Sequence, residues 1–121
     1  MIRSRPGAAS ALAGLLAGCA PLPPGSPARV EVVQGLVLPG WPGAVERHIA
    51  RACFPGPGPA GGALMDVWVN ELGIVRAVGP AEPGGDGPFA AQVAYAMLAT
   101  NCGRFPVPES PVRALVRVFP G

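Results

Sequence analysis

The stretch from Ala63 to Val78 constrains the fold of this chain more than any other part of it. Its first half, A-L-M-D-V-W-V, alternates two sets of side chains, which is the period of a strand with one buried face. The four residues N-E-L-G follow, and their glycine, Gly73, can take the positive φ that a tight turn needs. A β-branched, apolar run then resumes at Ile74. The sequence therefore predicts a β-hairpin whose buried face carries the alternate apolar residues Met65, Val67 and Val69.

Two helices are predicted, one on each side of this hairpin. The first runs from Pro42, which suits a first helical turn because its missing N–H has no intrahelical partner there, to about Cys53. The second runs from Pro88 to a stop at Gly103. Each carries an apolar stripe at helical spacing. The stripes comprise Val45, Ile49, Ala52 and Cys53 in the first helix, and Phe89, Val93, Ala96, Met97 and Thr100 in the second.

Residues 112–119 alternate again and predict a last strand with one buried face. The expected fold class is therefore α+β: a small αββαβ domain over residues 41–121, with a three-stranded antiparallel sheet and two helices on one face. The chain has 18 Gly and 17 Pro in 121 residues, most of them in three stretches, so the packed part must be small. Residues 30–38 are apolar enough for an extra edge strand, which Gly35 and Pro39 would keep short.

The N-terminus has the layout of an export signal. Arg3 and Arg5 precede an uncharged segment over residues 8–16 that is too short to span a bilayer. The sequence L-A-G-C then ends at Cys19, and it resembles the lipobox of bacterial lipoproteins, in which a thiol carries the lipid. We expect a signal peptide over residues 1–18 and lipidation of Cys19. An ordinary secretory signal cleaved near Ala20, or a free cysteine in an apolar run, remain as alternatives.

Residues 19–40 would then be the lipidated cysteine and a Pro-rich tether that favours extended conformations. The expected location is the periplasm, with the membrane as a partner through the lipid anchor. Ala20, rather than an aspartate, follows the cysteine. By resemblance to the sorting of lipoproteins, this favours the outer membrane.

The charge pattern makes nucleic acid an improbable partner. The formal net charge of +2 comes from Arg3 and Arg5, since seven Arg balance seven Asp and Glu from Cys19 onward. The chain has no Lys and no basic cluster. A protein that binds nucleic acid through phosphates needs such a cluster, so no nucleic-acid partner is expected.

Two cysteines remain after the lipobox, each at the end of a predicted helix. In an oxidising compartment Cys53 and Cys102 are natural disulfide partners, with free or reactive thiols as the alternative. The sequence has neither a C-x-x-C motif nor a second histidine beside His48, and a zinc site would need such ligands. No metal and no cofactor are therefore expected. His48 and Cys53 are five residues apart on a helix, a spacing that does not place a base and a nucleophile on one face.

The succession of these elements resembles the C-terminal domain of TolA and TonB, most closely that of α-proteobacterial TolA. The resemblance rests on M-D-V-W-V-N-E-L-G-I-V between two helices that each end in a cysteine, then R-F-P-V-P and a final V-F-P. It implies a periplasmic protein-binding module that uses sheet edges and helix faces. The family's transmembrane helix is replaced here by a lipoprotein-like signal with a shorter spacer, so the coupling to a membrane motor is not carried over.

Candidate contact residues follow from the strand alternation. Trp68 falls on the face away from the helices, and alternate residues of the last strand would share that face with it: Arg113, Leu115, Arg117 and Phe119. An exposed aromatic beside arginine is a plausible contact patch for a protein. The alternatives are that Trp68 covers the sheet against residues 30–38, or that it stacks on Arg117.

The leading hypothesis is a membrane-tethered, non-enzymatic module that binds a cell-envelope protein, such as a component of the Tol-Pal or TonB systems, in envelope integrity or transport. The second is a structural lipoprotein that serves in the assembly of an envelope complex. A hydrolase is poorly supported, because Ser26 and Ser110 each lie next to a proline in a predicted loop and His48 is the single imidazole.

Overall fold

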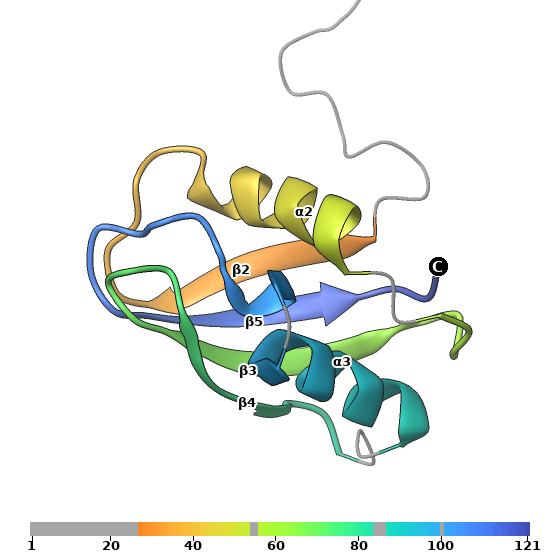
Figure 1. The fold of residues 1–121 in the computed structure, drawn as a ribbon. Coiled ribbons are helices and arrows are strands. Elements are labelled where there is room, and N and C mark those ends of the chain that lie inside the picture. Colours follow the sequence, from red (N-terminus) through yellow and green to blue (C-terminus); the bar gives the residue numbers. More distant parts are fainter. Residues whose placement is uncertain (1–26, 54–55, 84–86, 100) are drawn as a thin grey trace, which may run out of the picture.

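The computed structural model describes residues 27–53, 56–83, 87–99 and 101–121 (Figure 1). The expected signal peptide, the lipidation of Cys19 and the first part of the tether lie outside the described residues. In the described parts, no helix has the length and apolar character needed to cross a membrane.

Four antiparallel strands form one sheet, with β2 and β4 at its edges in the order β2-β5-β3-β4. Both helices lie on one face of this sheet, as the sequence predicted (Figure 1). The elements in chain order are β2 (Ala28–Gln34), α2 (Trp41–Ala52), β3 (Ala63–Val69), β4 (Val75–Pro80), α3 (Pro88–Ala99), the short 3-10 helix η2 (Asn101–Gly103) and β5 (Val112–Val118).

The α+β class is confirmed, but the prediction of three strands is wrong by one. Strand β2 pairs with β5 from Ala28 opposite Val118 to Gln34 opposite Arg113. It overlaps the predicted tether, residues 19–40, and also residues 30–38, for which a short extra strand was considered. An edge strand needs only one apolar face, so the mixed sequence A-R-V-E-V-V-Q gives a weak signal.

The core lies between the sheet and the two helices. Strands β3 and β5 bury every second residue, as their alternation predicted, and α2 and α3 bury one stripe each. The largest fully buried side chains are Val45 and Ile49 of α2, Met65, Val67 and Val69 of β3, Met97 of α3, Cys102, and Val112, Val116 and Val118 of β5.

The hairpin between β3 and β4 closes as predicted, with Gly73 at a φ of 83°. The side chain of Asn70 holds the turn together, because its Oδ1 accepts hydrogen bonds from the N–H groups of Leu72 and Ile74, both at 2.9 Å. The N–H of Phe105 donates to the carbonyl oxygen of Gly73 at 2.7 Å. The hairpin turn is thereby fastened to the segment that leads into β5.

Candidate protein-binding face of the sheet

The face of the sheet away from the helices, here called the outer face, carries the residues that alternate with the core. Strand β3 contributes Leu64, Asp66 and Trp68, and the adjacent strand β5 contributes Arg117, Leu115 and Arg113, which are their respective cross-strand partners. Trp68 is 42 % exposed. An aromatic ring therefore lies open on the middle of the sheet.

Trp68, Arg113 and Asp66 form one contact group on this face. The guanidinium carbon of Arg113 lies 5.4 Å from the centre of the Trp68 ring, within the range of a cation–π contact. The same guanidinium donates to both carboxylate oxygens of Asp66, from Nε at 3.0 Å and from Nη2 at 2.8 Å. These hydrogen bonds and the positive charge of Arg113 lower the pKa of Asp66, and the same bonds with the negative charge of Asp66 raise the pKa of Arg113.

Arg117 also lies on the outer face, toward the opposite end of β5 from Arg113. It donates to the carboxylate of Glu82 at 2.8 Å and to the carbonyl oxygen of Gly61 at 2.8 Å. Arg29 of β2 is its cross-strand partner on the other side. A shallow groove of about 300 Å³ crosses this region, lined by Arg29, Val30, Glu31, Leu64, Leu115 and Arg117. The outer face thus combines an exposed ring, aliphatic side chains and oriented guanidinium groups.

The structure places four of the five predicted contact residues together: Trp68, Arg113, Leu115 and Arg117. Phe119 lies one residue beyond β5, where it is half-buried and its N–H donates to the carbonyl oxygen of Pro27 at 2.8 Å. Trp68 stacks on Arg113, not on Arg117, because the register places Arg113 directly opposite it. Residues 28–34 do not cover Trp68 either, since β2 lies at the far edge beyond β5.

Two members of the face were missed by the sequence analysis. Asp66 alternates with Trp68, so its position on the outer face was readable from the strand period, but its ion pair depends on the register with β5. Glu82 lies after β4, in a segment without periodicity, and nothing in the sequence indicates that it meets Arg117.

The two edge strands differ in the hydrogen bonding of their outward backbone groups. At the β2 edge, the outward N–H of Val30 donates to the Glu46 carboxylate of α2 at 3.0 Å. At the β4 edge, the N–H of Ala81 donates to Leu64, so the alternation of an antiparallel ladder turns the N–H and C=O of Val78 away from β3. These groups of Val78 have no hydrogen-bond partner among the described residues. At the centre of the β2 edge the outward N–H is thus occupied by a side chain of the same chain, whereas the outward groups of Val78 at the β4 edge are not.

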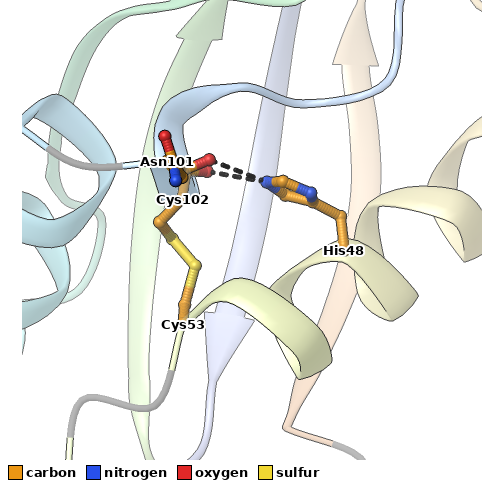
Figure 2. The surroundings of a disulfide bond; sticks show 4 residues. All are labelled: His48, Cys53, Asn101 and Cys102. Atoms are coloured by element: carbon orange, nitrogen blue, oxygen red, sulfur yellow. Dashed lines mark hydrogen bonds between the residues drawn. A yellow bond between two sulfur atoms is a disulfide. The ribbon is translucent and has the colours of Figure 1, made fainter.

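The disulfide predicted between Cys53 and Cys102 is present (Figure 2). It joins the end of α2 to η2, with the two Cα atoms 5.4 Å apart, and both residues are buried. Beside it, the ring of His48 points at two backbone carbonyl groups (Figure 2). Because carbonyl oxygens only accept, Nε2 of His48 carries the proton and donates to Asn101 at 3.2 Å and Cys102 at 3.3 Å.

The candidate nucleophiles of the sequence analysis are engaged in structural contacts. The sulfur of Cys53 is bonded to that of Cys102, so it is not a thiolate beside His48. The hydroxyl of Ser110 accepts from the N–H of Leu36 at 2.8 Å, and the carbonyl oxygens of Leu36 and Pro111 lie within reach as its acceptors at 3.3 and 3.2 Å. Ser26 lies outside the described residues. Within the described ranges, no group of three or more His, Cys, Asp and Glu side chains is placed to hold a metal ion.

Comparison of the chain with protein-family models, with curated proteins and with solved structures finds no match. The likeness to the TolA and TonB domains therefore rests on the quoted motifs alone.

Proposed function

We propose that this chain is a lipid-tethered, periplasmic protein-binding module that takes a cell-envelope protein on the outer face and open edge of its sheet. The observation that carries this proposal is the contrast between the two edges. The Glu46 carboxylate occupies the central outward N–H of β2, whereas the outward N–H and C=O of Val78 in β4, at the opposite edge, are free to pair with a strand from a partner.

Trp68 supplies specificity next to that edge. Its cross-strand partner in β4 is Ala77, whose small side chain leaves the ring accessible from the side of the open edge. On the other side, Arg113 stacks on the ring and is held in place by Asp66. Trp and Arg are the residue types that most often dominate binding energy at protein interfaces. A strand added beside β4 would place its side chains within reach of Trp68.

Pro80 limits the length of such an added strand. It has no N–H, so the open edge offers its backbone donor at Val78 and not at the end of β4. Short pairing of this kind suits a partner that is recognised by one or two side chains as well as by its backbone. The resemblance to the TolA and TonB domains agrees with this mode of binding and points to a component of the Tol-Pal or TonB systems.

The test is site-specific photo-crosslinking in cells that produce the full chain. A photo-reactive residue at Ala77 is expected to capture one discrete protein, whereas the same residue at Tyr95, exposed on α3, is expected to capture none. Val78→Pro removes the outward N–H of the open edge and is expected to reduce the adduct at least tenfold. The matched control is Val32→Pro, which removes an outward N–H from the opposite edge, at β2.

Three results would decide against this proposal. If Val78→Pro and Val32→Pro reduce the yield of the crosslinked adduct equally, and circular dichroism shows that both variants are folded, strand addition at β4 is ruled out. A stoichiometric complex that survives both Val78→Pro and Trp68→Ala would favour the assembly role. Intact mass of the membrane-extracted protein tests the tether, since a Cys19 without lipid contradicts it.

A further inference from the structure

Three loops meet at one end of the domain, here called the loop end (Figure 1). They are residues 35–40 after β2, residues 70–74 after β3 and residues 104–111 before β5. The third loop joins the other two: Glu109 and Ser110 donate their N–H groups to Leu36, at 3.2 and 3.1 Å, and Phe105 donates to Gly73. The indole Nε1 of Trp41 adds a bond of 2.7 Å to the carbonyl oxygen of Pro106. The loop end is thus a single, cross-linked surface.

Large aliphatic side chains project from all three loops. The exposed fractions are 65 % for Leu36, 47 % for Leu38, 65 % for Leu72 and 55 % for Val107. Single exposed aliphatic side chains need no explanation, but four at one end of a small domain mark a surface that is covered in use.

Two of the backbone N–H groups at the loop end are hydrogen-bonded within the loops. Leu36 and Leu72 each donate their N–H to a side-chain oxygen within the loops, at 2.8 and 2.9 Å. Val107 lies between two prolines, which have no N–H to satisfy. A backbone group left without a partner in an apolar medium is costly, so these bonds lower the cost of burying the loop end in one.

The connection to Cys19 is long enough to bring the loop end back to the membrane. Strand β2 starts at the opposite end of the domain and runs toward the loop end, as Figure 1 shows. Nine residue steps separate Cys19 from Ala28, and eight separate Ala28 from Leu36. At roughly 3.3 Å per step, each segment spans at most about 30 Å. The tether is therefore long enough for the start of β2 to lie away from the membrane while the loop end, one strand length back, touches it.

We propose that the loop end docks into the same bilayer that holds the lipid on Cys19, with Leu36, Leu38, Leu72 and Val107 in the region between headgroups and acyl chains. This inference rests on the proposed tether. Tethering makes the contact intramolecular, so a weak apolar insertion that would not hold a free protein suffices here.

The charges of the loops favour a zwitterionic surface. Glu71 and Glu109 are exposed on these loops and Arg104 is the one cation among them, so an anionic surface offers no attraction. Docking in this orientation stands the sheet upright on the membrane. The outer face and the open β4 edge then face sideways, where an envelope partner can reach them.

The test uses the full lipidated protein in phosphatidylcholine vesicles, some of which carry brominated acyl chains that quench tryptophan. Leu72→Trp and Leu98→Trp place the same probe at the loop end and on the exposed side of α3. The added emission at position 72 is expected to lose at least half its intensity to the quencher, and that at position 98 to lose little. Leu36→Asp with Val107→Asp, in the Leu72→Trp background, is expected to abolish this quenching while the protein stays on the vesicles.

Equal quenching at positions 72 and 98, or none at 72 in a lipidated and vesicle-bound protein, would overturn the docked loop end and leave the tether intact. A chain whose intact mass shows no lipid on Cys19 and which does not float with vesicles would overturn both. A photo-crosslink from position 72 to a protein, without lipid quenching, would assign the loop end to a protein partner instead.

Discussion

Trp68 and Arg113 face each other across β3 and β5, with the guanidinium carbon 5.4 Å from the centre of the indole ring. Asp66 holds the same guanidinium through two hydrogen bonds, so the arginine is oriented before any partner arrives. A preoriented aromatic–arginine pair loses less conformational entropy on binding than two mobile side chains do.

Replacing Trp68 by alanine is expected to weaken the captured partner's binding by more than about tenfold, because exposed Trp residues are frequent hot spots. The unfolding midpoint should move little, since the ring lies outside the core. Titration with the partner and thermal denaturation measure the two effects. Trp68→Phe is the matched control and should retain part of the affinity. A large fall in stability with unchanged binding would show that Trp68 serves the fold.

Acid is expected to remove the contribution of the Asp66–Arg113 pair. The pKa of Asp66 lies below its ordinary value of 3.8 in the folded protein, so the pair stabilises the fold above that pH and loses its effect as pH falls through the lowered value. Asp66→Asn should therefore be less stable than the wild type at pH 7, and this difference should disappear as the pH falls through the lowered pKa of Asp66. Denaturation curves over a series of pH values from 7 downward provide the check, and a difference that does not shrink in acid contradicts the assignment.

Removing the disulfide is expected to cost a large share of the domain's stability. The bond joins residues 49 apart in sequence, and closing a loop of that length stabilises a fold by about 4 kcal/mol in the chain-entropy model. A small domain has only about 5–15 kcal/mol in total. Urea unfolding of the wild type and of the Cys53→Ala, Cys102→Ala double variant measures the loss. Reductant should destabilise the wild type by a similar amount and leave the double variant unchanged.

Alanine at Gly73 is expected to destabilise the hairpin by about 1–3 kcal/mol, because its positive φ is strained for any side chain. The added Cβ would also fall on the carbonyl oxygen of Phe105. Gly61→Ala is the control, since it has open space around its Cα and no positive φ. Similar unfolding free energies for the two variants would contradict the role given to this turn.

The hairpin, both helices and β5 could be predicted from the sequence because each buries a full stripe or alternate residues against the core. The disulfide could be predicted as well, because two cysteines remain after the lipobox, each at the end of a predicted helix, and an oxidising compartment was expected. For strand β2, the sequence offered only the alternative of a short extra strand within residues 30–38. Its three inward residues, Ala28, Val30 and Val32, are too few to outweigh the polar residues between them.

The sequence predicted which residues share the outer face, but not which of them are in contact. Strand alternation placed Trp68 and Arg113 on the outer face, but only the register shows that they are opposite each other. The bond from Val30 to Glu46 joins residues 16 apart through the packing of α2 on β2, which no local pattern encodes. The loop end depends on three separate loops and has no sequence signal at all.

Strand β5 is the last element in the sequence and lies between β2 and β3 in the sheet. Until its residues leave the ribosome, β2 has no neighbouring strand and the core lacks Val112, Val116 and Val118. The order of the sequence therefore prevents the four-stranded sheet from closing before β5 has been synthesised, although β2, β3 and β4 all precede it.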